Sequence, residues 1–344
     1  MKVLVTGTDG YIGVVLASRL MREGHDVVGL DTGYYRSGWL VTDPSTLNRL
    51  PTSICADIRH VRPSDLDGVD AVVHLAELSN DPLGESNRKV TLDINHLGSV
   101  KLANAAKQAG VRRFVYTSSC SVYGLATENV VDEASAVNPQ TAYAECKVLV
   151  ERDVGALASD VFTPVFLRNA TAFGASPRMR FDIVLNNLCG LAWTTRKIAM
   201  TSDGSPWRPI VHIEDICTAV TCALDAPADA ISGQAFNVGS NDENYRVREI
   251  AKIVQQVFPE SDLTFGDSGG DNRSYKVNFD KIHRTLPAFS CKWTALAGAQ
   301  QLRALFERIK LSPELFNHSA YTRLHCLNQL IDTGQIDADY YWVS

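Results

Sequence analysis

The stretch Val5-Thr6-Gly7-Thr8-Asp9-Gly10-Tyr11-Ile12-Gly13 lies between two apolar segments of different periodicity. Residues 2–6 are rich in β-branched side chains, as in a strand buried on both faces, and residues 14–20 begin an apolar helical pattern. The first glycine allows a tight turn, the second lets the backbone approach a ligand, and the third lets helix pack on strand. Free N–H groups at the helix start would bind phosphate. The stretch, with Tyr11 and Ile12, therefore predicts a pyrophosphate-binding turn.

An acidic residue follows the next apolar strand. Residues 26–30 lead to Asp31, which lies 18 residues after Gly13. A carboxylate at this distance accepts hydrogen bonds from a ribose diol and repels a 2′-phosphate. We therefore expect NAD rather than NADP as the cofactor, although Arg36 nearby leaves NADP as the alternative.

The composition is that of an ordinary globular enzyme. Of the 344 residues, 45% are hydrophobic and 21% are charged, and the formal net charge is −6. No basic cluster indicates a nucleic-acid surface, and no apolar run reaches the roughly 20 residues needed to span a bilayer. The eight cysteines form no Cys-x-x-Cys pair and accompany no His cluster, so we expect no metal site. Free thiols indicate a reducing cytoplasm.

Strand-like and helix-like segments alternate through the first half of the chain. Further strands are expected at 53–56, 71–75 and 113–117, and helices at 97–109 and 142–157. This alternation predicts an α/β fold, a Rossmann-type doubly wound parallel sheet, with ligands at the carboxyl ends of the strands. We expect an NAD-binding domain over 1–172 with later strands interleaved, a smaller α/β substrate-binding lobe over 173–311, and a tail over 312–344 whose helix covers 321–331.

A hydroxyl and an ammonium are spaced for catalysis on the second of these helices. Tyr143 and Lys147 are four residues apart and share a helix face. A free phenol has a pKa of about 10, and a nearby ammonium together with a positive nicotinamide ring would lower that pKa. Tyr143 could then take a proton from an alcohol or give one to a ketone. Ser119, at the end of a predicted strand, could align the substrate oxygen, so the three residues predict hydride transfer to or from a nicotinamide.

Together these residues resemble the extended short-chain dehydrogenase/reductase family, in its branch of nucleotide-sugar epimerases and dehydratases. The resemblance covers about residues 1–310 and implies that Asp57, Ile58, Leu75, Ala76 and Asn95 contact the cofactor, as do Tyr143 and Lys147. It extends to the segments Val122-Tyr123-Gly124, Trp207–Asp215, Asn237-Val238-Gly239 and Asp271-Asn272-Arg273.

The same resemblance implies a substrate side. Arg208 and Arg273 would clamp a diphosphate, a task that suits guanidinium groups. Asn187 would lie near the nucleotide or the diphosphate, and Thr171 stands where many members carry Asn. Glu77 replaces the usual second Ala of His-Leu-Ala-Ala.

Departures from the family pattern narrow the expected chemistry. The 4,6-dehydratases carry Thr-Asp-Glu where this chain carries Ser119-Cys120-Ser121, so the acid and base for elimination of water are missing. The Ser-x-Glu arrangement of sugar-acid decarboxylases is also absent. Cys120 occupies the position of the dehydratase acid, and cysteines near this loop act as acid or base in some 3,5-epimerising relatives. A small filler beside the nicotinamide is the simpler interpretation of Cys120.

The sequence therefore predicts an NAD-dependent enzyme that acts on a nucleoside diphosphate sugar at C4. Epimerisation through a transient 4-keto sugar is the first interpretation, and reduction of a 4-keto sugar by the same residues is the alternative. A hydroxysteroid or other small-alcohol dehydrogenase would have no use for two diphosphate-binding arginines, and a non-catalytic cofactor sensor would lose Tyr143 or Lys147. By analogy with the fold, a homodimer is expected through the helices at 97–109 and 143–157.

Overall fold

The centre of the molecule is a seven-stranded sheet in which every pair of neighbouring strands is parallel. The structure, a computed structural model, describes residues 1–40, 50–126, 129–267 and 273–343. In spatial order the strands are β10 (Gln234–Val238), β6 (Thr163–Asn169), β5 (Arg113–Ser119), β4 (Ala71–His74), β1 (Lys2–Thr6), β2 (Asp26–Asp31) and β3 (Thr52–Cys55).

The strand order reverses between β1 and β4. From β1 the chain adds β2 and β3 on one side, and from β4 it adds β5, β6 and finally β10 on the other. Ligands of such sheets bind at this reversal, outside the carboxyl ends of the strands. The predicted Rossmann-type α/β fold is therefore confirmed, and a strand from the second half of the chain completes the sheet.

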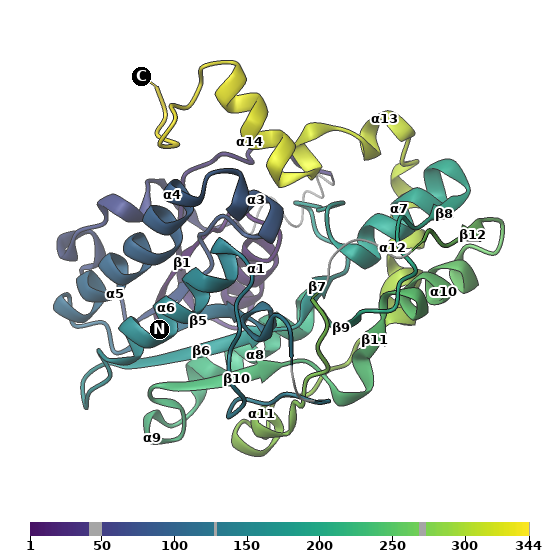
Figure 1. The fold of residues 1–344 in the computed structure, drawn as a ribbon. Helices are drawn as coiled ribbons and strands as arrows, with labels where there is room; N and C mark the ends of the chain where they lie inside the picture. The colour runs from purple at the N-terminus through teal and green to yellow at the C-terminus, as the bar shows by residue number, and fades with distance from the viewer. Residues whose placement is uncertain (41–49, 127–128, 268–272, 344) are drawn as a thin grey trace.

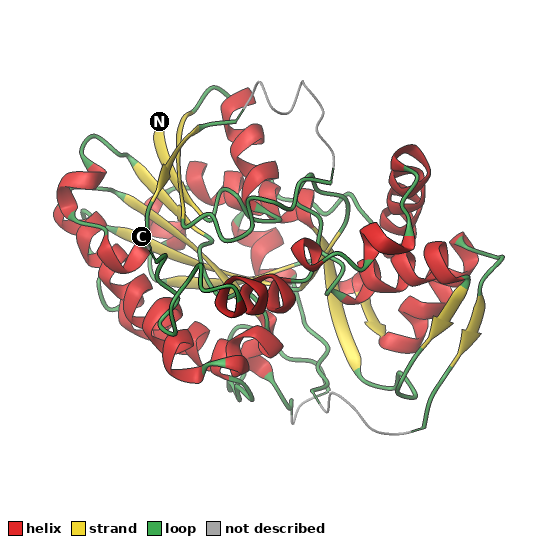
Figure 2. Cartoon of the chain, turned by 90° about the horizontal axis from the view of Figure 1, so that it is seen from above, coloured by secondary structure: helices red, strands yellow, loops and turns green. Residues whose placement is uncertain are grey.

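Helices cover both faces of the sheet because strand side chains alternate between two apolar clusters (Figure 2). Val3 and Val5 of β1 point into one cluster, and Leu4 points into the other. The first cluster is closed by α1 (Gly13–Arg22), α8 (Ile213–Asp225), α9 (Ala228–Ile231) and α11 (Asp280–Thr285), and the second by α3 (Asp81–Ser86), α4 (Arg88–Thr91), α5 (Ser99–Gln108) and α6 (Ala142–Gly155). Among the described residues, no helix combines the length and the apolar character needed to cross a membrane.

A smaller lobe lies beside the carboxyl ends of the sheet (Figure 1). It holds a three-stranded sheet of β11 (Asn244–Arg246), β9 (Trp207–His212) and β7 (Thr171–Phe173), and a two-stranded sheet of β12 (Asp262–Thr264) and β8 (Lys197–Ala199). Its own apolar cluster is formed with the helices α7 (Val184–Thr195), α10 (Val247–Val257) and α12 (Ala295–Ile309). The second half of the chain thus contributes to all three sheets and to both lobes.

The last residues return to the first lobe. After α13 (Pro313–Phe316), α14 (Arg323–Asp332) leads the chain back over the N-terminal half (Figure 1). Leu327, Ile336 and Tyr340 are buried in the same apolar cluster as Leu4 of the central sheet. The tail is therefore part of the covering of the N-terminal half.

The helix expected at 97–109 begins differently. Residues Leu92–Gly98 form a π-helix, and regular α-helix starts only at Ser99. The wider turn contains Asn95, whose side-chain amide accepts a hydrogen bond from the N–H of Leu78 and donates one to its C=O, at 2.8 and 3.0 Å. The π-helix thus places an amide group against the chain that follows β4.

Candidate active site

A cavity of about 580 Å³ lies at the carboxyl ends of the parallel strands and extends to the smaller lobe. Strand ends, the glycine turn, α6 and α14 all contribute to its wall. The predicted residues that line it are Gly7, Gly10, Tyr11, Ile12, Gly13, Asp31, Asp57, Ile58, Leu75, Ala76, Ser119, Tyr143, Lys147, Thr171, Arg208 and Arg273.

The glycine turn is too tight to accept side chains at Gly7 and Gly13. Gly7 has a φ of +76°, and a Cβ on Gly13 would lie 2.0 Å from the carbonyl oxygen of Gly7. The N–H of Gly10 donates to that same oxygen at 3.0 Å, which closes the turn in front of α1. The turn lines the cavity directly before α1, whose start has no side-chain cap, and a glycine turn in front of a helix start fits a pyrophosphate.

Asp31 is held in place at the end of β2. Its carboxylate accepts hydrogen bonds from the N–H groups of Gly33 and Asp9, at 2.8 and 2.9 Å. Burial raises the pKa of Asp31, and these two N–H donors oppose the rise. Arg36, which left NADP open as an alternative, is directed to Asp9, with 3.2 Å between its Nε and Oδ2 of Asp9. The carboxylate of Asp31 thus remains at the cavity wall, where it fits a ribose diol.

Ser119, Tyr143 and Lys147 meet at the opposite end of the cavity. Ser119 is the last residue of β5, and α6 begins after Thr141, whose side chain accepts a hydrogen bond from the N–H of Ala144. Lys147 Nζ lies 5.3 Å from the centre of the Tyr143 ring and donates to the C=O of Thr117 at 2.5 Å. The three side chains are therefore brought to one place, as their spacing predicts.

The charges around Tyr143 act in opposite directions. Burial raises the pKa of Tyr143, whereas the Lys147 ammonium lowers it and a hydrogen bond with Ser119 lowers it further. The carboxylates of Glu77 and Asp81 raise it again, so the resulting pKa lies above the usual value of a phenol. The protein alone therefore keeps Tyr143 protonated at neutral pH.

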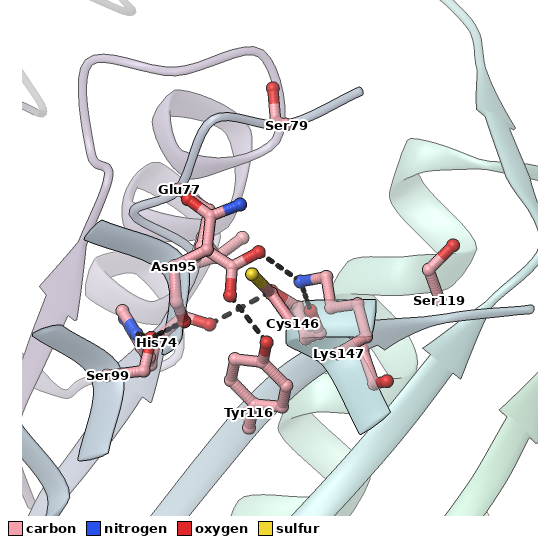
Figure 3. A network of polar contacts seen from close by, with 12 residues as sticks. His74, Glu77, Ser79, Asn95, Ser99, Tyr116, Ser119, Cys146 and Lys147 are labelled. Atoms are coloured by element: carbon pink, nitrogen blue, oxygen red, sulfur yellow. Dashed lines mark hydrogen bonds and ion pairs between the residues drawn. The ribbon is translucent and has the colours of Figure 1, made fainter. Parts of the chain in front are cut away.

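Glu77 lies beside Lys147, and the sequence did not predict a role for it (Figure 3). Its side chain is 3% exposed and forms an ion pair with Lys147, which is 4% exposed. The other carboxylate oxygen accepts a hydrogen bond from the hydroxyl of Tyr116, at 2.5 Å. The only signal in the sequence is the carboxylate at the position after His74-Leu75-Ala76, where relatives carry Ala.

The two predicted diphosphate ligands lie on the side of the smaller lobe. Arg208, in β9, donates to the C=O of Trp207 at 2.7 Å and to the C=O of Arg273. Arg273 forms an ion pair with Asp81 of α3, which belongs to the first lobe. Both guanidinium groups line the cavity, and Arg273 also joins its two sides. The preceding motif residues, 271 and 272, lie outside the described part of the chain.

Three predicted residues are not part of the cavity wall. Asn95 is fully buried and binds the backbone of Leu78, so it supports the segment after β4 from behind. Asn187 donates to the C=O of Phe181 at 2.9 Å. Cys120 is buried and donates to the C=O of Arg168 at 3.1 Å, and burial raises the pKa of its thiol. The placement of Cys120 agrees with the filler interpretation.

Residues from distant parts of the chain also line the cavity, although no local pattern marked them. Arg323 of α14 is 3% exposed, and its guanidinium lies 3.8 Å from the centre of the Tyr35 ring. Arg180 pairs with Asp182 at 2.8 Å, and the N–H of Arg323 donates to the same carboxylate. This group joins the tail, the smaller lobe and the loop after β2 around one end of the cavity.

The tail covers the part of the wall that holds Asp31 and Asp57. Trp342 donates from its indole N–H to the C=O of Thr32 at 2.7 Å. The ring of Tyr341 lies 3.7 Å from the guanidinium of Arg59, and that guanidinium is ion-paired with Asp57 at 2.7 Å. The sequence left open whether the tail touches the site, and in the structure it does.

Comparison with known proteins agrees with this geometry. A model of the NAD dependent epimerase/dehydratase family matches residues 3–239. The UDP-glucose 4-epimerase of Mycolicibacterium smegmatis is 34% identical over 260 residues, 71% of this chain and 78% of that protein. YtcB of Bacillus subtilis, named as an uncharacterized UDP-glucose epimerase, is 25% identical over 329 residues, 93% of this chain and 98% of that protein. The solved structure of MoeE5 in complex with UDP-glucuronic acid and NAD is 26% identical, with a TM-score of 0.77 over 90% of this chain and 100% of that chain.

The match covers more than half of the chain and includes the glycine turn, Asp31, Ser119, Tyr143 and Lys147. It confirms the predicted resemblance, the enzyme class and the cofactor. This chain belongs to the NAD-dependent epimerase/dehydratase family and is an NAD-dependent enzyme.

Proposed function

We propose that this enzyme is a 4-epimerase of a nucleoside diphosphate sugar that acts through a transient 4-keto sugar. The main support is that the glycine turn, the Ser119–Tyr143–Lys147 group, Arg208 and Arg273 all line one cavity. A dinucleotide, a carbinol and a diphosphate therefore each find matching groups within a single space. The relatives named UDP-glucose 4-epimerase support the same reaction.

The residues of the cavity divide the reaction between them. The N–H groups at the start of α1 would hold the pyrophosphate of NAD, and Asp31 would hold its ribose diol. Bound NAD supplies a hydride acceptor and, once reduced, a hydride donor. Tyr143 Oη removes the proton of the 4-hydroxyl and later returns a proton to the same oxygen, which Ser119 Oγ orients by a hydrogen bond.

Arg208 and Arg273 would hold the diphosphate while the sugar ring turns between the two proton transfers. Arg273 forms an ion pair with Asp81, so a bound diphosphate would compete with that carboxylate. Such an anchor fixes the nucleotide and leaves the sugar free to present either face. Epimerisation requires this freedom of the sugar ring, whereas elimination of water does not.

Elimination of water has less support. The position after Ser119 is occupied by Cys120, which is buried and directed to the C=O of Arg168. Ser121 lines the cavity but has no acidic group. The acid and base of a 4,6-dehydratase are therefore missing from the loop that carries them in that subgroup.

Reduction of a 4-keto sugar is the second candidate, and the ion pair of Glu77 with Lys147 favours it. An ammonium whose charge is offset by a neighbouring carboxylate leaves Tyr143 as a phenol. A phenol is the form that donates a proton to a ketone. The same residues bind the same class of substrate in both reactions. The two proposals differ in whether NAD stays bound and is restored within one turnover.

One experiment on the purified protein separates these reactions. The protein is denatured and any released dinucleotide is identified, while fresh enzyme is incubated with nucleotide sugars without added cofactor. Retained NAD and interconversion of C4 epimers are the results expected for the epimerase. Turnover only of 4-keto sugars with added NADH would establish the reductase instead. If no nucleotide sugar binds, both proposals are wrong.

Two further features remain predictions. A homodimer through α5 and α6 is supported by Leu97, whose side chain is 57% exposed next to these helices. Light scattering on the purified protein tests this, and a monomer would contradict it. A reducing cytoplasm is supported by the eight cysteines, all of which are free thiols in the structure.

A further inference from the structure

We propose that Glu77 is a positioning residue for proton transfer, which acts through Lys147. The Glu77 carboxylate fixes the Lys147 ammonium and offsets part of its charge beside Tyr143, so the working pH range of Tyr143 lies higher than a lone ammonium would set it. The proposal rests on the proposed function only in taking Tyr143 as the proton-transfer group.

The geometry gives Glu77 both of the contacts it needs for this role. One carboxylate oxygen pairs with Lys147 Nζ, and the other accepts the hydroxyl of Tyr116 (Figure 3). Lys147 Nζ is also bound to the C=O of Thr117 at 2.5 Å. The ammonium is therefore held between a carboxylate and a carbonyl, and its position next to the Tyr143 ring is set by groups from the segment after β4 and from β5.

The charges of this pair are both buried, so they act on Tyr143 over a short distance with little screening by water. A buried carboxylate without a partner is costly, and a buried ammonium without one is costly as well. Burial lowers the pKa of Lys147, but the Glu77 carboxylate raises it above its usual value, so Lys147 stays charged. Burial raises the pKa of Glu77, and the Lys147 ammonium and the Tyr116 hydroxyl oppose that rise. Tyr143 thus faces an ion pair instead of a single positive charge.

The other titratable groups around the pair do not replace this effect. His74 of β4 is buried between the hydroxyls of Thr6 and Ser99, and its pKa falls to about 3, so it is neutral. Burial raises the pKa of Cys146 of α6 to about 12, so it is a neutral thiol. Asp81 of α3 raises the pKa of Tyr143, but it is itself paired with Arg273.

A direct catalytic role for Glu77 would require a different arrangement. Both of its oxygens are engaged by donors, so a proton transfer to substrate would first have to break the pair with Lys147 or the hydrogen bond with Tyr116. Tyr143 lines the same cavity, and its hydroxyl has no comparable ion pair to break. Glu77 therefore acts through Lys147.

The test measures the ionisation of Tyr143 directly and needs no substrate. The enzyme is labelled with tyrosine carrying 13C at Cζ and loaded with NADH, whose nicotinamide ring is uncharged, and the Tyr143 resonance is assigned with Tyr143→Phe. In the wild-type enzyme we expect no ionisation of Tyr143 below about pH 10. A midpoint near neutral pH would overturn the proposal.

The matched variants test the cause. Glu77→Gln keeps the size of the side chain and removes its charge, and we expect the ionisation of Tyr143 to move down by at least about one pH unit. Glu151→Gln is the control, because Glu151 lies on α6, the helix that carries Tyr143 and Lys147, and forms a buried ion pair with Arg168 at 2.7 Å. It should leave the ionisation of Tyr143 where it is.

If Glu77→Gln does not fold, Glu77→Ala, which carries the residue usual at this position, takes its place. A folded variant in which Tyr143 ionises at the wild-type pH or higher would overturn the proposal. A lowered ionisation in a protein that turns over no nucleotide sugar would support the role of Glu77 while contradicting the proposed function. Where turnover is measurable, the acidic limb of the pH profile of kcat, which reports the ionisation of Tyr143 as the base, should shift in the same direction.

Discussion

Two buried ion pairs lie at opposite ends of the same cavity, and they are built in different ways. The pair of Glu77 and Lys147 is enclosed by β4, β5 and α6 of the first lobe. The pair of Asp57 and Arg59 is covered by the tail, whose Tyr341 ring lies on the Arg59 guanidinium.

The comparison separates two uses of buried charge. At the catalytic end, the charge acts on a group that exchanges a proton, so its effect is on chemistry. At the nucleotide end, Arg59 also donates to the C=O of Asp339 at 2.9 Å, so its effect is to hold a segment that lies far away in the sequence. Changes at one end should therefore alter proton transfer, and changes at the other should alter retention of the cofactor.

The largest effect is expected from a substitution at the catalytic end of the cavity, where Tyr143 and Lys147 lie. Tyr143→Phe removes the hydroxyl that exchanges the proton and keeps the ring in place, so turnover should fall on the order of 10²–10⁴-fold while NAD remains bound. Steady-state kinetics and the dinucleotide content of the purified protein measure both. Tyr245→Phe is the control, because it removes a hydroxyl that is bound to Glu243 in the smaller lobe, and it should retain most of the activity. Loss of NAD from Tyr143→Phe would contradict the separation of the two ends.

The next effect concerns the turn between the ends. In Gly13→Ala the new Cβ would lie 2.0 Å from the Gly7 carbonyl oxygen, so the turn has to open. Such overpacking costs about 1–3 kcal/mol, and the affinity for NAD should fall by roughly tenfold or more. Calorimetric titration with NAD, on protein from which bound NAD has been removed, measures this affinity.

Gly155→Ala is the matched control, because its Cβ would meet only ordinary contacts at 3.6 Å with Phe166. It should bind NAD as the wild type does. An unchanged affinity in Gly13→Ala would mean that the dinucleotide does not use this turn.

Both predictions rest on parts of the site that the sequence located well, and the reason is local spacing. Gly7, Gly10 and Gly13 form one turn, and Tyr143 and Lys147 share one helix face, so short stretches of chain determine their geometry. The carboxyl end of β5 then brings Ser119 to them, because parallel strands end at one edge of the sheet. The fold class followed from the alternation of strand-like and helix-like segments in the first half of the chain.

Long-range packing explains what the sequence did not locate. Arg323 reaches the cavity only because α14 returns over the first lobe, and no sequence pattern near Arg323 predicts this course of the chain. Asn95 was predicted to meet the cofactor, and instead the wider turn of a π-helix directs it to the backbone of Leu78. Glu77 was visible only as a departure from a motif, since its partner Lys147 lies 70 residues further along the chain.

A moderate effect is expected at the nucleotide end. The double variant Tyr341→Ala/Trp342→Ala removes a cation–π contact worth about 0.5–2 kcal/mol and a hydrogen bond to Thr32. NAD should then dissociate several-fold faster, because the segments that carry Asp31 and Asp57 lose their cover. Exchange of bound NAD against labelled NAD measures the rate.

The control for the tail is Phe265→Ala, an aromatic side chain that is 43% exposed on the smaller lobe. It should leave the exchange rate unchanged. The pH profile of turnover should also be unchanged in the tail variant. A shifted pH profile with an unchanged exchange rate would reverse the assignment of the two ends.

The smallest effect is expected for an ion pair near the surface, which serves as a comparison for the two buried pairs. Asp153 of α6 pairs with Arg152 and His96, and its side chain is 29% exposed. Hydrogen bonds from Arg152, then from His96, lower the pKa of Asp153 to about 2 against the opposing effect of burial.

Because the folded-state pKa of Asp153 lies below its unfolded value of about 3.9, the carboxylate stabilises the fold above that pH, and the contribution is lost as the pH falls toward 2. Screening by solvent limits it to less than about 1 kcal/mol. Asp153→Asn should therefore lower the free energy of unfolding slightly at pH 6 and not at pH 2, as measured by urea titration at both pH values. A loss at pH 6 as large as that of Glu151→Gln would show that burial does not set the strength of these pairs, and the contrast between the two ends of the cavity would then need another cause.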